Sequence, residues 1–125
     1  MTSLREDAQP VYLDLDLAIS QIGDAAALPG MLGMLEESLA RDIPKISEVL
    51  AAGDVLAANR LLHPLKGFLP IFCGDALCAN VSRVEALSKA GACAVVAPAY
   101  AALRPELELL LAEVTHFLNA SGAAH

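Results

Sequence analysis

The sequence predicts an all-α protein, an antiparallel up-down four-helix bundle with a short extra N-terminal helix. Apolar residues recur at every third or fourth position from about residue 14 almost to the end, which is the spacing of one helix face. Alanine and leucine, which both favour helix, dominate the composition, and no segment alternates apolar and polar residues for long enough to predict a strand. Short Gly-Asp connections at 53–54 and 74–75 indicate that neighbouring helices run antiparallel.

The first predicted helix is short and covers residues 14–22, after which Gly23 and Asp24 supply a stop signal and a new start signal. The second carries a continuous apolar stripe over residues 28–50. Pro44 lies inside this stripe and is expected to bend the helix, because proline removes a backbone donor and clashes with the preceding turn. Since the apolar register continues on both sides of Pro44, we expect one bent helix.

The third and fourth helices are predicted from the two Gly-Asp connections. The connection at 53–54 ends the second helix and caps the third, which is expected over residues 55–72. The connection at 74–75 is expected to end the third helix and cap the fourth in the same way, and Gly91 closes the fourth.

The last helix completes one predicted domain. Its apolar register runs from Val96 to Phe117, with Pro98 expected in its first turn and Pro105 expected to bend it. A chain of 125 residues is long enough for one hydrophobic core, so we expect a single helical domain over residues 11–120. The ends of the chain, at 1–10 and 121–125, are expected to be loosely held tails.

The charge balance excludes some classes of partner. The net charge is −7, and the basic residues form no concentrated patch, so nucleic-acid binding and attachment to an anionic membrane are not expected. No apolar run approaches the ~20 residues that span a bilayer, and the polar N-terminus lacks the apolar segment of a signal peptide. A cytoplasmic, soluble protein is therefore expected.

Cysteines do not predict a metal site. Cys73, Cys78 and Cys93 are irregularly spaced and form no C-x-x-C pair. We expect them to be reduced thiols that act as small buried hydrophobic residues. Two further histidines, His116 and His125, stand without partners in the sequence and are expected to face solvent.

The most informative run is His-Pro-Leu-Lys-Gly at residues 63–67, inside the third predicted helix. At about 100° per residue, His63, Lys66 and Gly67 project to the same polar side. The opposite side is expected to face the core and carries Leu61, Leu65, Phe68 and Phe72, with Leu62 and Leu69 at its flanks. His63 is therefore predicted to be exposed.

This combination of residue types favours a histidine that carries a phosphoryl group. Lys66 follows His63 by three residues, so its ammonium can reach the same spot and hold an anion. Gly67 costs about 1 kcal/mol relative to alanine in a helix interior, and we interpret it as clearing space beside His63 for a partner. A metal site is not expected, because Lys66 repels cations and no second ligand lies four residues from His63. A surface histidine without a task is the alternative, but it does not explain these neighbours.

The pattern His63-x-Leu65-Lys66-Gly67 resembles the H-x-L-K-G motif of histidine-containing phosphotransfer (HPt) domains. The similarity extends to Gly74, to the pair Val84-Glu85 and to the order and lengths of the helices from about residue 14 to residue 118. Pro64, Phe68 and Pro70 depart from the residues usual in the family, and Gly74 comes one residue later than usual. Pro64 either orients the His63 ring by bending the helix or is simply a tolerated kink.

The resemblance implies a phosphocarrier of two-component phosphorelays. His63 would accept a phosphoryl group from the aspartyl phosphate of a receiver domain and pass it to another receiver, with Lys66 stabilising the phosphoryl group. The partners would be receiver domains of response regulators or of a hybrid sensor kinase. The carrier would be a monomer with no cofactor and no catalytic activity of its own, because Mg²⁺ belongs to the receiver.

Four further residues are expected to contribute to receiver docking because they share the face of His63, namely Leu56, Asn59, Arg60 and Pro70. Two other classes of function remain open. One is an interaction module that binds receivers or kinases without being phosphorylated. The other is an enzyme that uses His63 as base or nucleophile, which needs a cleft and supporting acids, and the sequence indicates neither near His63.

Overall fold

Helices form nearly all of the structure. The computed structural model describes residues 10–120. The elements are α2 (Leu15–Ile22), the 3₁₀ turn η1 (Ala25–Ala27), α3 (Leu28–Ala51), α4 (Val55–Phe72), α5 (Asp75–Lys89) and α6 (Cys93–Ala120). The all-α prediction is confirmed. In the described part of the chain, β-type pairing is limited to an isolated bridge between Leu13 and Cys73. Apart from Pro10, the predicted tails lie outside the described residues.

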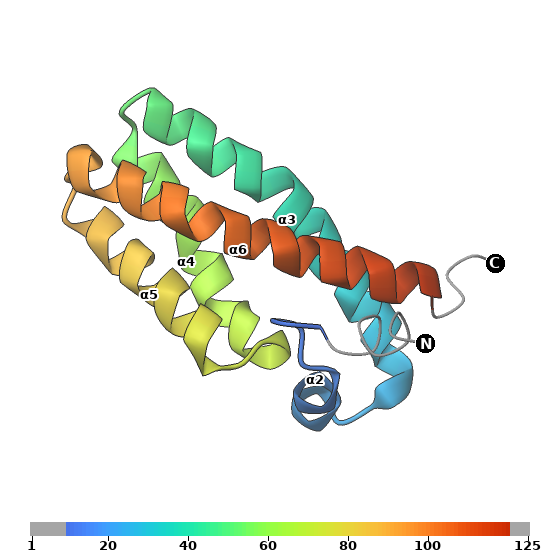
Figure 1. Ribbon diagram of the computed structural model, residues 1–125. Coiled ribbons are helices and arrows are strands. Elements are labelled where there is room, and N and C mark those ends of the chain that lie inside the picture. The colour runs from blue at the N-terminus through green and yellow to red at the C-terminus, as the bar shows by residue number, and fades with distance from the viewer. Residues whose placement is uncertain (1–9, 121–125) are drawn as a thin grey trace.

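The four long helices lie side by side around a shared apolar core, and α2 lies near one end of them (Figure 1). α3 contacts both α4 and α6, and α5 contacts α4 and α6. The largest fully buried apolar side chains come from all four, including Leu32, Leu39, Leu62, Leu77 and Leu107. Among the described residues, no helix is long and apolar enough to cross a membrane.

Aspartate side chains cap the start of two helices; the cap at Asp54 was predicted, whereas Asp14 was expected to be the first residue of its helix. The Asp14 side chain accepts a hydrogen bond from the backbone amide of Leu17, and the Asp54 side chain accepts one from Ala57. A cap of this kind stabilises a helix by about 1 kcal/mol. Gly53, with φ at 80°, makes the left-handed turn into α4, so the α4 boundaries coincide with the predicted 55–72.

Two other helix starts were predicted wrongly. Asp75 is the first residue of α5 and not its cap, because Gly74 occupies the cap position, where it has no side chain to accept a hydrogen bond. α6 begins at Cys93, so Pro98 lies beyond the first turn, in which it was expected. The chain reverses at Gly91, whose φ is positive, and the next helix starts directly afterwards. The backbone amides of Val95 and Val96 already donate to the carbonyl of Ala92.

Five prolines lie inside helices without ending them, and all five are exposed: Pro44, Pro64, Pro70, Pro98 and Pro105. Each proline removes one backbone donor, which frees the carbonyl four residues earlier. On the outer side of a helix, water can bond to such a carbonyl, so the defect is tolerated there. This position explains how α3 and α4 continue through their prolines as single helices.

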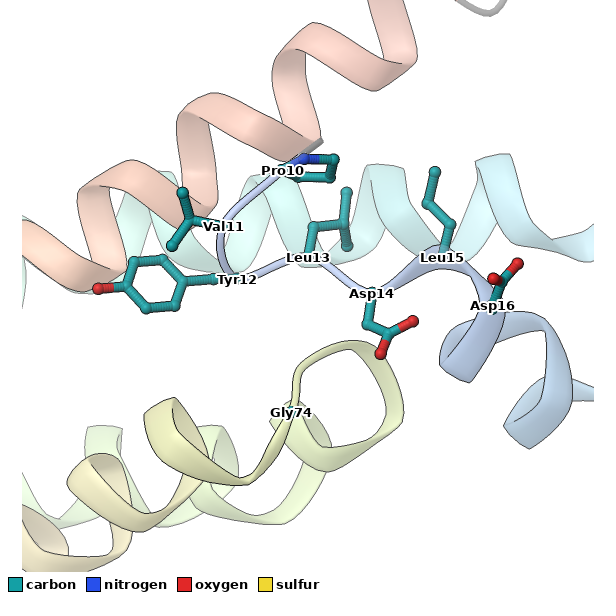
Figure 2. A pocket seen from close by; sticks show the side chains of 8 residues that line it. All are labelled: Pro10, Val11, Tyr12, Leu13, Asp14, Leu15, Asp16 and Gly74. Carbon is teal, nitrogen blue, oxygen red and sulfur yellow. The ribbon is translucent and has the colours of Figure 1, made fainter. Parts of the chain in front are cut away.

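The segment before α2 is held at both its sides. The Glu113 carboxylate of α6 accepts hydrogen bonds from the backbone amides of Val11, Tyr12 and Leu13. The amide of Asp14 donates to the carbonyl of Phe72 at the end of α4 over 2.8 Å. Figure 2 shows residues 10–16 passing between α6 and the turn at Gly74, where they line a hollow.

Candidate functional site

The polar face of α4 presents His63 to solvent. The side chain of His63 is 64% exposed and that of Lys66 is 34% exposed. The buried stripe of α4 consists of Val55, Ala58, Leu62, Leu65, Leu69 and Phe72. The prediction that His63 faces outward is therefore confirmed.

The centre of the buried stripe differs from the expected one. Leu62 and Leu69 are fully buried, although they were expected only at its flanks. Leu61 and Phe68, which were expected to point inward, are half-buried. The stripe is turned toward α5 because α4 packs against both α3 and α5. As a result, Lys66 lies closer to α5 than a helical-wheel projection of the α4 sequence indicates.

A carboxylate lies directly beside His63, contrary to the expectation that no supporting acid is near. Glu85 of α5 is 1% exposed, and its Oε2 lies 3.2 Å from Nδ1 of His63. Sequence reasoning noted Glu85 only within the pair Val84-Glu85 and assigned it no contact. Its position next to His63 depends on how α4 and α5 pack, which no local pattern encodes.

Glu85 is the centre of a polar network that joins the two helices. Lys66 Nζ lies 3.2 Å from Oε1, and Asn59 Nδ2 lies 3.2 Å from Oε2. Lys89 of α5 adds an ion pair at 3.7 Å from Oε2. The Asn59 amide also donates to Ser88 Oγ over 2.9 Å, and that hydroxyl donates to the backbone carbonyl of Glu85 over 2.6 Å. Among the described residues, no buried side-chain nitrogen or oxygen lacks a hydrogen-bond partner.

The network keeps Glu85 ionised despite its burial. Burial disfavours the carboxylate, but hydrogen bonds from His63, Lys66 and Asn59 and the charge of Lys66 outweigh it, so the pKa of Glu85 lies below its ordinary value. A buried carboxylate is tolerated only when it is paired in this way.

An ionised Glu85 determines the chemistry of the His63 ring. A carboxylate only accepts hydrogen bonds, so Nδ1 of His63 must carry the proton that points to Glu85. In the neutral ring the lone pair is then on Nε2, at the far edge of a largely exposed side chain. The site therefore presents an oriented nitrogen nucleophile to solvent, with a fixed negative charge behind it.

Gly67 lies on the exposed face one turn after His63. A Cβ atom built on Gly67 has no atom within 4 Å, so nothing in the described part of the molecule requires glycine there. Its helical backbone also needs no glycine, because the positive-φ glycines are Gly23, Gly53 and Gly91.

The four expected docking residues divide into two groups. Leu56 is 60% exposed, and Arg60 and Pro70 are also exposed. Asn59 is half-buried, and its amide is used by Glu85 and Ser88. Asn59 is thus part of the network that holds Glu85, whereas the other three are free to meet a partner.

Other reactive groups lie elsewhere and do not form a second centre. The three cysteines are free, and burial raises the pKa of Cys73 to about 12, so its thiol is unreactive. Within residues 10–120 no group of three or more histidine, cysteine or acidic side chains is arranged to hold a metal ion. His116 is exposed, as expected, and His125 lies outside the described residues.

Two surface hollows are lined by other parts of the chain. The one in Figure 2 is formed by residues 10–16 and Gly74. The other is mainly apolar and lies between α3 and α4; it is lined by Met31, Met34, Leu35, Ser38, Phe68, Ile71 and Phe72. Neither includes His63, Lys66 or Glu85, so the reactive nitrogen lies on an open helix face and not in these hollows.

No protein-family model, curated protein or solved structure matches this chain. Its function therefore has to be inferred from its own residues and their geometry.

Proposed function

We propose that this protein is a histidine phosphocarrier of a two-component phosphorelay. His63 accepts a phosphoryl group from the aspartyl phosphate of a receiver domain and passes it to the aspartate of another. The proposal includes the antiparallel up-down four-helix bundle with its short extra helix, a monomeric state and a cytoplasmic location. The observation that carries it is the contact between the exposed His63 and the buried, ionised Glu85.

The chemical step uses the orientation of the His63 ring. The Nε2 lone pair attacks the phosphorus in line, and the N–P bond forms as the P–O bond to the aspartate breaks. The aspartate leaves with the electron pair of that bond. The ring keeps its proton on Nδ1 and becomes positively charged, and Glu85 stabilises this charge across the 3.2 Å contact. No proton has to leave the ring, so the reverse transfer regenerates the neutral histidine.

The other groups of the exposed face have supporting roles. Lys66, held by Glu85 at 3.2 Å, lies within one helical turn of His63 and can bind an oxygen of the phosphoryl group. Gly67 leaves room for the receiver, and Leu56, Arg60 and Pro70 contribute exposed surface for docking. The receiver positions the phosphate and supplies the Mg²⁺, so the carrier itself needs neither a cleft nor a cofactor.

The main alternative is an interaction module that binds receivers or kinases without phosphorylation. Docking alone has no use for a buried carboxylate beneath an exposed histidine, because such a pair costs desolvation energy. An enzyme that uses His63 as a base is supported by the presence of Glu85, but it lacks a substrate cleft at His63 among the hollows described above.

The test is phosphorylation of the purified protein by a phosphorylated receiver domain and, separately, by phosphoramidate. We expect a base-stable, acid-labile phosphate on wild type, which ³¹P NMR identifies as phosphohistidine on Nε2. His63→Gln is expected to abolish the signal, and His116→Gln, which changes an exposed histidine of α6, is expected to leave it intact. Transfer that survives His63→Gln would overturn the proposal.

A further inference from the structure

Two lysines lie on opposite oxygens of the same buried carboxylate. Lys66 reaches Oε1 of Glu85 from α4, and Lys89 reaches Oε2 from α5, one turn after Glu85 itself. Oε2 is also the oxygen that contacts His63 Nδ1, so Lys89 lies on the histidine side of the carboxylate. The motif in α4 gives no indication of Lys89, because the residue belongs to the end of the next helix.

Lys89 is not needed to satisfy Glu85. The carboxylate already accepts hydrogen bonds from His63, Lys66 and Asn59, each at 3.2 Å. At 3.7 Å, the Nζ of Lys89 lies beyond hydrogen-bond length from Oε2, and its side chain is 58% exposed. Its ammonium is thus a spare donor on a flexible stem that is free to reorient.

The charges around His63 show what this spare cation is suited for. With His63 neutral, one carboxylate and two ammonium groups leave a surplus of one positive charge beside the nucleophile. A phosphoryl group brings about two negative charges at neutral pH. Phosphorylation also leaves one positive charge on the His63 ring. With Lys66 alone, two positive charges would face about three negative ones from Glu85 and the phosphoryl group, and Lys89 supplies the missing positive charge.

We propose that Lys89 is a second phosphoryl-binding residue, which rests on the proposed function of His63. When His63 is phosphorylated, the Lys89 ammonium moves from Oε2 of Glu85 to a phosphoryl oxygen, while Lys66 binds from the side of α4. The two cations then hold the phosphoryl group from two helices. The site is a dianion-binding site that is completed from α5.

The test compares Lys89→Gln, Lys89→Arg and the matched control Lys45→Gln, which changes an exposed lysine of α3 paired with Glu48. The rate of His63 phosphorylation by phosphoramidate is measured by intact-mass spectrometry at low and high salt. Lys89→Gln is expected to be slower than wild type by about fivefold, the size expected for unit charges ~4 Å apart in water. The difference should shrink at high salt, Lys89→Arg should keep most of the rate, and Lys45→Gln should match wild type.

Three outcomes would overturn the inference. If wild type is phosphorylated on His63 and Lys89→Gln reacts equally fast, Lys89 has no role at the phosphoryl group and the proposed function stands. If Lys89→Gln is slow only because it has a lower melting temperature, and Lys89→Arg does not restore the rate, the residue is structural. If wild type is not phosphorylated on His63 by either donor, the proposed function fails and the inference fails with it.

Discussion

Glu85 and Glu113 each gather several donors onto one carboxylate, but the donors differ in kind. Glu113 binds three consecutive backbone amides, of Val11, Tyr12 and Leu13, and so anchors a segment of chain. Glu85 binds only side chains, and one of them is the largely exposed ring of His63. A carboxylate that anchors backbone has a complete structural role. A carboxylate that holds an exposed reactive side chain indicates that this side chain acts on another molecule.

The largest effect is expected from Glu85→Gln, which should remove the functional role that distinguishes Glu85 from Glu113. The neutral amide no longer fixes the proton on Nδ1 or stabilises a charged ring, and it leaves Lys66 and Lys89 without their counter-charge. We expect the rate of phosphorylation by phosphoramidate to fall about 10–100-fold, by analogy with the loss of an orienting partner at metal-bound histidines.

The measurement for Glu85→Gln combines that rate with ¹⁵N NMR of the His63 ring, which should change from a single tautomer to a mixture. Glu113→Gln is the matched control, since it changes the other multiply bonded glutamate and lies far from His63 in sequence. A Glu85→Gln variant with wild-type rate and tautomer would show that the contact does not orient the ring.

Glu113→Gln is expected to have the converse effect, a loss of stability without a loss of reactivity. The amide oxygen can keep the Tyr12 and Leu13 donors that share Oε1, but the exposed amide of Val11 then faces the NH₂ group and loses its partner, at a cost of about 0.5–1.5 kcal/mol. Hydrogen exchange at Val11, Tyr12 and Leu13 should accelerate, and urea denaturation should give the loss of unfolding free energy. Unchanged exchange would mean that the segment is held by Leu13 and the Asp14–Phe72 hydrogen bond alone.

Local signals predicted much of the fold and half of the site. α4 was predicted to its end residues because Gly53 and Asp54 define its start and Gly74 follows its end. His63, Lys66 and Gly67 were found because a helix places residues three or four apart on one face. The error at Asp75 arose because a Gly-Asp pair starts α4 and α5 differently, with the aspartate as cap in one and as first helical residue in the other.

Glu85 and Glu113 could not be found in this way, because each acts on a distant part of the chain. Glu85 lies next to Val84 on the edge of the buried stripe of α5, where an acid is normally taken as solvated surface. Only the packing of α4 on α5 turns it into the partner of His63. The partner of Glu113 is a segment about 100 residues earlier, as the three amide contacts show, and that segment has no periodicity to predict its position.

The smallest effect is expected from Gly67→Ala. This variant tests whether glycine at this position is needed for docking of a receiver or for the protein's own structure. A Cβ at Gly67 meets no atom within 4 Å, so alanine should stabilise the helix by about 0.4–1 kcal/mol. Phosphoramidate is too small to require the cleared space and should react with the variant at the wild-type rate. A phosphorylated receiver must place its own backbone over this face, so its transfer rate should fall. Equal rates for wild type and variant with the receiver would show that Gly67 does not provide clearance for docking, whereas slower reaction with both donors would place the effect on His63 itself.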